Sequence, residues 1–235
     1  MDKNIFRRVE KKYIITKEKL EELMNILDDY IVEDKYFENT ICNIYFDSDD
    51  YTLISKSIDK PVYKEKVRMR SYFVPSLDTK VFLEIKKKYK GVVGKRRVEA
   101  TLKEIYEYLE NGIDMENETQ IMKEIDYMFK LYDLKPKAFI AYDRLSYHAK
   151  NNKDFRITID KNLRARLDNL RLEYSDEGFL ILDENKYIME IKTLDAYPKW
   201  FADVLSSLKI YPSSFSKYGN LYKNYILKNK EEKNV

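Results

Sequence analysis

The sequence predicts an α+β protein whose strands form an antiparallel sheet with one charged and one aliphatic face. Three observations support this expectation. Many segments alternate charged and apolar residues with the two-residue period of a strand, others repeat apolar residues at helical spacing, and Glu-x-Lys occurs in three strand-like segments. Because side chains alternate along a strand, each Glu shares a face with its Lys, and the residues between them face the other way.

Strands and helices alternate in the first half of the chain. The first strand is expected over residues 9–15, and Thr16 can cap a helix that runs to about residue 30. An apolar stripe supports this helix and consists of Leu20, Leu23, Met24 and Leu27. Further strands, separated by turn residues, are expected over residues 41–47, 61–74, 80–89 and 94–100.

The second half begins with helices and returns to strands. Thr101 and Glu104 form the signature of a capping box, which opens a short helix that ends at Asn111-Gly112. A second helix is expected over residues 118–132. Strands follow over residues 138–148, 155–160, 178–182 and 186–192. Pro198 fits the first position of another helix, and a last helix starts near Tyr218.

Composition limits the kinds of site that the chain can hold. A single Cys (Cys42) and a single His (His148) exclude an internal disulfide, a multi-Cys zinc site and a His-based metal cluster. The net charge of +3 argues against a nucleic-acid-binding coat, so an anion site must arise from local sorting of charge.

The chain also lacks obvious boundaries and membrane segments. One domain is expected over residues 1–228, followed by a charged tail at residues 229–235. No apolar run reaches the roughly 18 residues that span a bilayer, and the N-terminus lacks the apolar core of a signal peptide. A cytoplasmic protein is therefore expected.

One predicted strand carries four cations at period two, namely Lys64, Lys66, Arg68 and Arg70. Like charges at this spacing repel, so they must face water or anions. A solvent-exposed edge strand is one explanation, since lysines on edge strands oppose aggregation. The two arginines favour an anion site, because guanidinium groups match phosphate oxygens.

The three Glu-x-Lys segments contain Glu10 with Lys12, Glu84 with Lys86, and Glu190 with Lys192. They can be ordinary cross-strand ion pairs on a wet sheet face. Their repetition instead favours carboxylates that hold Mg²⁺ or Mn²⁺ beside lysines that bind phosphate.

Other cations extend these patterns. Arg144 and Arg156 lie among apolar residues, where an arginine either reaches toward water or meets a buried anion. Lys95 and Arg97 share a strand face, opposite Arg96. Ser216 precedes the last helix and could cap it or contribute to phosphate binding.

The order of the elements and several short motifs resemble the catalytic domain of the vacuolar transporter chaperone (VTC) polyphosphate polymerases, within the triphosphate tunnel metalloenzyme, or CYTH-like, superfamily. The resemblance covers about residues 5–227. Its motifs are Glu10-Lys11-Lys12-Tyr13, Arg68-Met69-Arg70-Ser71-Tyr72, Glu84-Ile85-Lys86, Phe155-Arg156-Ile157-Thr158-Ile159-Asp160, Met189-Glu190-Ile191-Lys192 and Ser214-Phe215-Ser216-Lys217. In the last motif Ser214 replaces a family lysine.

This resemblance implies an antiparallel β-barrel tunnel with a charged interior and flanking helices. It implies catalytic cations at Arg68, Arg70, Lys86, Arg144 and Arg156. It implies substrate-binding residues at Lys12, Lys66, Lys95, Lys192, Ser216 and Lys217. Glu190, together with Glu10 or Glu84, would hold Mn²⁺ or Mg²⁺.

The implied function is a polyphosphate polymerase that transfers the γ-phosphate of ATP onto a growing polyphosphate chain. Two alternatives stay open: a tripolyphosphatase or nucleoside triphosphatase of the same fold, and a non-catalytic polyphosphate-binding module. The implied partners are ATP and inorganic polyphosphate or triphosphate, without nucleic acid, and a membrane-protein partner is an option.

Overall fold

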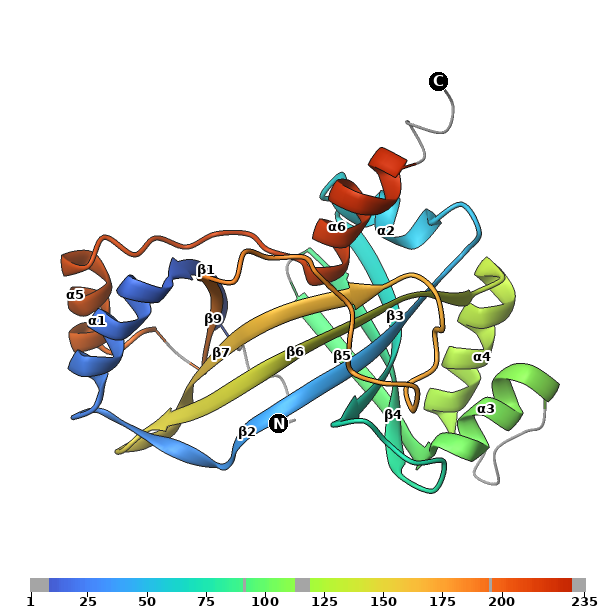
Figure 1. Ribbon diagram of the computed structural model, residues 1–235, viewed down its shortest axis with the longest axis horizontal. Coiled ribbons are helices and arrows are strands. Elements are labelled where there is room, and N and C mark those ends of the chain that lie inside the picture. The colour runs from blue at the N-terminus through green and yellow to red at the C-terminus, as the bar shows by residue number, and fades with distance from the viewer. Residues whose placement is uncertain (1–8, 91, 113–118, 195, 230–235) are drawn as a thin grey trace. The chain divides into compact units, whose positions relative to one another are not determined.

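The computed structural model describes residues 9–90, 92–112, 119–194 and 196–229, and it confirms the α+β class (Figure 1). The chain forms two compact units. Unit 1 comprises Met1–Asn39, Tyr142–Leu163 and Leu180–Ser216, and unit 2 comprises Thr40–Ala141, Arg164–Phe179 and Lys217–Val235. The expectation of one domain over residues 1–228 stays a prediction, and residues 230–235 of the expected tail lie outside the described residues.

Nine strands of the described residues belong to one sheet, in the hydrogen-bonded order β1-β9-β7-β6-β2-β3-β4-β5, with β8 paired to β7. Antiparallel pairs join β1 to β9, β7 to β9, and β2, β3, β4 and β5 in succession. The strands are β1 (Val9–Thr16), β2 (Ile31–Asp47), β3 (Tyr63–Tyr72), β4 (Lys80–Tyr89), β5 (Val92–Thr101), β6 (Lys135–Ala149), β7 (Asn152–Arg166), β8 (Phe179–Leu180) and β9 (Lys186–Thr193). Closure of this sheet into a barrel stays a prediction.

Two strands extend furthest beyond the bounds that their patterns predicted. Strand β2 begins at Ile31 rather than residue 41, and β7 continues to Arg166 rather than residue 160. Both strands, like β6, pass from one unit into the other. Their extra length follows from pairing with neighbouring strands, which supplies backbone hydrogen bonds that the local sequence does not reveal.

Helix α2 (Thr52–Ile58) was not predicted. Its preceding residue, Tyr51, adopts a left-handed backbone (φ 60°) and provides no side-chain cap. Instead, the carboxylate of Asp47 accepts the backbone N–H groups of Leu53 and Ile54 at 2.8 and 3.0 Å. The cap therefore comes from the end of β2, outside the local pattern that normally marks a helix start.

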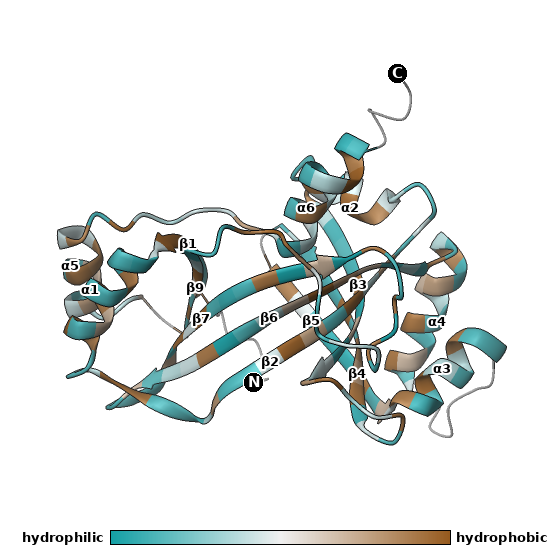
Figure 2. Cartoon of the chain, viewed as in Figure 1, coloured by the Kyte–Doolittle hydropathy of each residue, from teal (hydrophilic) through white to brown (hydrophobic). Residues whose placement is uncertain are grey.

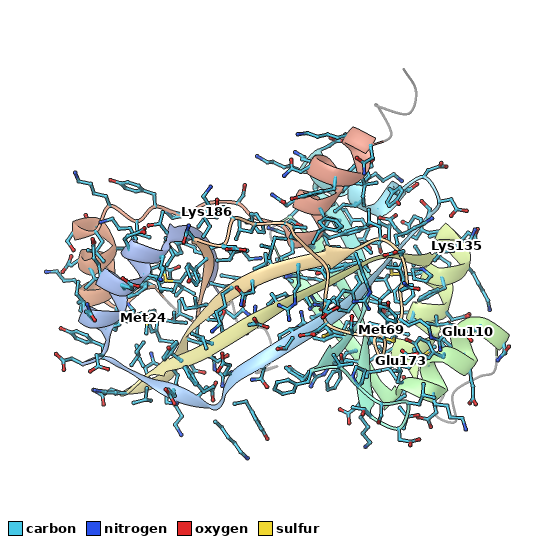
Figure 3. The ribbon with its side chains drawn as sticks, in the orientation of Figure 1. Met24, Met69, Glu110, Lys135, Glu173 and Lys186 are labelled. Carbon is cyan, nitrogen blue, oxygen red and sulfur yellow. The ribbon has the colours of Figure 1, made fainter. Side chains whose placement is uncertain are left out.

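The helices of unit 1 cover the aliphatic face of its strands. Helix α1 (Lys17–Leu27) is capped by Thr16 as predicted, and α5 (Lys199–Ser207) follows Pro198. Figure 3 labels Met24, which contributes to this layer. The core combines strand and helix residues and includes Tyr13, Leu23, Leu27, Phe155, Ile157, Met189, Ile191 and Phe201.

Two helices of unit 2 cover the aliphatic face of β3 and β4. Helix α3 (Leu102–Asn111) has the predicted capping box and a left-handed Gly112 at its end, and α4 (Gln120–Tyr132) is capped by Thr119. Figure 2 shows hydrophobic residues on both helices and on the neighbouring strands. This core includes Ile44, Val67, Met69, Leu83, Ile85, Leu102, Ile105, Ile125 and Met128.

The last helix, α6 (Lys217–Leu221), continues as a π-helical turn over Tyr222–Leu227. Among the described residues, no helix combines the length and apolarity needed to cross a membrane. In each unit the aliphatic strand face lies under helices. The opposite strand faces carry the charged residues.

Candidate functional site

The charged face of unit 1 is organised in rows across three strands. The register places Glu10 of β1 opposite Lys192 of β9, which lies opposite Arg156 of β7. The next row joins Lys12, Glu190 and Thr158 in the same strand order. Carboxylates and cations therefore alternate along β1 and β9, and each carboxylate lies opposite a cation of the neighbouring strand.

We call Glu10, Lys12, Arg144, Glu190 and Lys192 the Glu190 cluster. The Glu190 side chain is 8% exposed, and its carboxylate lies 3.1 Å from Lys192 Nζ and 3.8 Å from Arg144 Nη2. Lys12 Nζ lies 4.0 Å from Glu10 Oε1 and donates a 3.4 Å hydrogen bond to the Phe215 carbonyl. The structure thus brings together five of the predicted site residues in one unit.

Electrostatics keep Glu190 ionised. Burial raises the pKa of its carboxyl, but the positive charges of Lys192, Lys12 and Arg144 outweigh burial and hold this pKa well below its ordinary value. Glu190 is therefore a carboxylate at neutral pH, which is the form that binds a metal ion.

Arg144 meets a buried anion, as one of the two sequence interpretations predicted. Its Nε and Nη2 donate to the two carboxylate oxygens of Asp160 at 2.6 and 2.9 Å, and the Asp160 side chain is fully buried. This bidentate pair fixes the guanidinium plane beside Glu190. In the sequence, Asp160 stands out only as the last residue of a motif. Its pairing with Arg144 depends on how the strands lie beside one another.

Arg156 differs from Arg144. Its side chain is 54% exposed, lies 3.9 Å from Asp34 and donates a 3.4 Å hydrogen bond to the Lys153 carbonyl. It shares a row with Lys192, so it lies on the charged face. Arg156 is thus an exposed cation at the margin of the Glu190 cluster.

The charged face of unit 2 also forms rows. Lys66 of β3, Lys86 of β4 and Lys95 of β5 occupy directly opposed positions. In the next row, Arg68 lies opposite Glu84, which lies opposite Arg97. We call Lys66, Arg68, Arg70, Glu84, Lys86 and Lys95 the Glu84 cluster, and all six belong to the predicted site residues.

Glu84 is held by two cations. Its side chain is 2% exposed, with Arg68 Nη2 at 2.7 Å and Lys95 Nζ at 2.5 Å. Burial raises the pKa of Glu84, but Arg68, Arg70 and Lys95 outweigh burial and lower this pKa to about 2. These short ion pairs make Glu84 less accessible to a metal ion than Glu190.

The Glu84 cluster has more positive than negative charge. Burial lowers the pKa of Lys95, and the positive charges of Arg70 and Arg68 lower it further, although the ion pair with Glu84 raises it. Three directly opposed lysines on neighbouring strands repel each other in the same way. An anion with several negative oxygens would relieve this repulsion.

Two polar residues of β2 support the arginines and were not identified from the sequence. The Asn43 side chain accepts a 2.9 Å hydrogen bond from Arg70 Nε and donates one of 3.0 Å to the Ile140 carbonyl. Arg68 Nη1 lies 3.5 Å from the Tyr45 hydroxyl. The sequence shows only that both residues lie in a predicted strand. Their contacts with the arginines depend on the register between β2 and β3.

The remaining predicted residues lie where unit 1 ends and α6 begins. Ser216 is the last residue of unit 1, and Lys217 is the first residue of α6 in unit 2. Ser214 is exposed. A phosphate site formed by Ser216 and the helix N-terminus stays a prediction, and so does a role for Lys217 in substrate binding.

The described residues contain no group of three or more His, Cys, Asp or Glu side chains suited to a metal ion. Glu190 and Glu10 form a pair of neighbouring carboxyl groups. Thr158 lies directly opposite Glu190, and its hydroxyl oxygen is buried with no hydrogen-bond partner. These oxygens suit Mg²⁺ or Mn²⁺, which bind few protein ligands and complete their coordination with water and phosphate oxygens.

Comparison with known proteins places the chain in a family. The family model of the VTC domain matches residues 7–226. No curated protein matches the chain.

Among solved structures, a Bacillus halodurans protein described as a candidate adenylate cyclase has a TM-score of 0.56 and 14% identity, with 93% of this chain and 97% of that chain covered. A Vibrio parahaemolyticus protein described in the same way has a TM-score of 0.48 and 11% identity, with 91% and 97% covered. The Bacillus protein shows a similar fold. The match to the family model over nearly the whole chain, including both clusters, shows that this protein belongs to the VTC domain family.

Proposed function

We propose that this protein is a metal-dependent polyphosphate polymerase, which transfers the γ-phosphate of ATP onto a growing polyphosphate chain. The observation that carries the proposal is the Glu190 cluster. It combines a buried, ionised carboxylate with the neighbouring cations Lys12, Lys192 and Arg144 of three strands. This combination suits a metal ion bound together with a triphosphate.

Glu190 and Glu10 would hold Mn²⁺ or Mg²⁺, with the unpartnered Thr158 hydroxyl as an additional oxygen ligand. The metal would supply charge stabilisation to adjacent phosphate groups. Lys12 and Lys192 lie beside the two carboxylates and would bind phosphate oxygens that the metal leaves uncovered. Asp160 would hold the guanidinium group of Arg144 in position before the substrate binds.

The Glu84 cluster of unit 2 is, by itself, also suited to bind phosphate oxygens. Arg68 is fixed by Glu84, and Arg70 is fixed by Asn43. Such preorganised guanidinium groups bind phosphate without losing much side-chain entropy. The lysine row Lys66, Lys86 and Lys95 presents positive charge at regular strand spacing, which matches a chain of phosphates better than a single phosphate.

Phosphoryl transfer depends on in-line positioning and charge neutralisation more than on a nucleophilic side chain. Cys42, the only thiol in the chain, is buried, and burial raises its pKa to about 12. It is therefore a core residue and takes no part in the proposed reaction. The acceptor in the polymerase is the terminal phosphate of polyphosphate.

The decisive experiment incubates the purified protein with ATP and Mn²⁺ and separates the products on a gel. We expect the wild-type protein to make long polyphosphate, and we expect Glu190→Gln to lose at least about 100-fold in rate because it weakens metal binding. Glu184→Gln, the same change at an exposed glutamate just before β9, is the matched control and should keep full activity.

Two results would replace the proposal. Release of phosphate without chain growth would identify a tripolyphosphatase or nucleoside triphosphatase, with water as the acceptor. Tight binding of triphosphate without turnover would identify a polyphosphate-binding module. Calorimetry with tripolyphosphate, performed beside the activity assay, separates this second result from a protein that has lost its fold.

A further inference from the structure

An exposed apolar surface lies at the end of unit 2 where β3 begins, β4 ends and β5 begins (Figure 1). The register places Tyr63 opposite Tyr89, and Tyr89 opposite Val92, so the three side chains form a row on one sheet face. They are 45%, 54% and 71% exposed. Val62, which precedes β3, and Val93, which lies opposite Lys88 on the other sheet face, are 61% and 46% exposed at the same end of the strands. We call these five residues the tip patch.

Lysines surround the tip patch. Lys90 Nζ lies 5.4 Å from the centre of the Tyr89 ring, and its backbone N–H donates a 3.0 Å hydrogen bond to the Val62 carbonyl. Lys64 lies directly opposite Lys88 on the sheet face that carries Val93, and its Nζ donates a 3.1 Å hydrogen bond to the Ser57 carbonyl. Burial, followed by the charges of Lys88 and Lys60, lowers the pKa of Lys64. These lysines are close enough to repel one another, so an anionic surface would stabilise them.

One buried carboxylate lies beside the aromatic row, since Glu65 of β3 accepts a hydrogen bond from the Tyr63 hydroxyl and pairs with Lys87 at 3.9 Å. No Asp or Glu occurs between Glu84 and Glu99, whereas Lys or Arg recurs throughout that segment. Lys87 and Arg96 also pair with Glu124 of α4, so carboxylates compensate their charges. The lysines beside the apolar row therefore give this end of the sheet a net positive charge.

We propose that the tip patch and its lysines form a docking surface for an anionic lipid bilayer. Valine and tyrosine side chains would enter the interfacial region, where tyrosine is favoured, and the lysine ammonium groups would meet headgroup phosphates. Exposed apolar area on a soluble unit is more costly in water than at such an interface. The inference goes beyond the proposed catalytic function and does not depend on it.

The combination of residues favours a bilayer over other anions. A polyphosphate chain in solution would neutralise the lysines but would leave the valines in water. A single RNA strand could stack on Tyr63 and Tyr89, yet it would gain little from Val62, Val92 or Val93. Only a partner with both an anionic surface and an apolar layer uses every member of the patch.

The first test places a probe in the patch. Val92→Cys, labelled with an environment-sensitive fluorophore, should show a blue shift with vesicles of phosphatidylcholine and phosphatidylglycerol, and little change with phosphatidylcholine alone. The buried Cys42, with its raised thiol pKa of about 12, should not take the label. Tyr211→Cys in unit 1 is the matched control, because Tyr211 and Val92 are both 71% exposed.

The second test measures vesicle flotation of unlabelled variants. Lys90→Glu removes one attraction and adds one repulsion, so its affinity for the anionic vesicles should fall about 30-fold. Val92→Ser should also weaken binding, whereas Lys153→Glu, at an exposed lysine of unit 1, should reduce it much less. Circular dichroism confirms that each variant is folded.

Three results would overturn the proposal. The first is absence of the wild-type protein from floated anionic vesicles. The second is an equal blue shift from the labelled Tyr211→Cys variant, which would show non-specific adsorption. The third is that the wild-type protein binds single-stranded RNA, that Lys90→Glu and Val92→Ser abolish this binding, and that neither variant changes vesicle binding. This result would assign the patch to nucleic acid. Polyphosphate synthesis is measured separately and has no bearing on these outcomes.

Discussion

Two glutamates with the same sequence pattern have different surroundings. Glu190 lies 3.1 Å from Lys192 and has a second carboxyl group, that of Glu10, as a neighbour. Glu84 forms ion pairs of 2.7 and 2.5 Å with Arg68 and Lys95. The first arrangement suits metal binding, and the second mainly orients cations. The chemistry of each glutamate therefore depends on the residues opposite it in the sheet.

The lowered pKa of Glu84 predicts how stability depends on pH. Its carboxyl titrates at about 2 in the folded protein, against 4.5 as its ordinary value. A carboxyl whose pKa is lower in the folded state stabilises that state above about pH 4.5, and this contribution disappears as pH falls toward 2. We expect Glu84→Gln to destabilise the protein by about 3 kcal/mol at pH 7 and progressively less below pH 4.5.

Urea unfolding from pH 7 to pH 3 measures this effect. Glu99→Gln, in the neighbouring strand β5 with a side chain that is 47% exposed, provides the control and should change the pH dependence little. If Glu84→Gln and the wild-type protein lose stability in parallel as pH falls, Glu84 is not the group that titrates.

At the scale of elements, local caps begin α3 and α4 of unit 2. The Thr101 hydroxyl accepts the backbone N–H of Glu104 at 3.2 Å, and the Glu104 carboxylate accepts the backbone N–H of Thr101 at 2.7 Å. These two hydrogen bonds satisfy backbone N–H groups that have no acceptor within the helix at the start of α3. The box also fixes where β5 ends and α3 begins.

Thr101→Ala should lower the free energy of unfolding by about 1 kcal/mol, because it leaves the Glu104 N–H without its side-chain acceptor. Thermal or urea unfolding measures the change. Lys103→Ala, in the same turn at a side chain that is 63% exposed, is the control and should change stability by less than about 0.5 kcal/mol. Equal effects from both variants would mean that the capping box adds no stability.

At the scale of the whole molecule, charge is sorted by strand face, and the net charge stays small. The chain has 44 basic and 41 acidic residues, for a net charge of +3. The Glu84 cluster nevertheless contains five cations and one carboxylate, because its residues share one face of β3, β4 and β5. A weakly charged protein can therefore present a strongly cationic surface to a polyanion.

This sorting predicts salt-dependent binding of tripolyphosphate. Raising salt from about 50 to about 200 mM should weaken its binding by about ten-fold, because salt screens exposed cations and competes for them. Calorimetry measures the affinity, and duplex DNA serves as the comparison and should bind more weakly at each salt concentration. Affinity for tripolyphosphate that does not change with salt would show that the cationic faces do not bind it.

Local patterns were sufficient for much of the fold. Strand β4 has its predicted bounds, and the box at Thr101 and the stop at Gly112 define α3 as expected. Helix α2 was missed because its cap, Asp47, belongs to the preceding strand. The long ends of β2 and β7 were missed because pairing, and not local preference, keeps them extended.

The sequence by itself determined which residues could share a face, since alternation along a strand requires no knowledge of its neighbours. It therefore identified Glu190 with Lys192 and the cations of β3. Only the tertiary structure decided which residues lie opposite them, such as Asp160 beside Arg144 and Asn43 beside Arg70. Register is set by packing of the aliphatic face against helices, and that packing involves residues far apart in the chain.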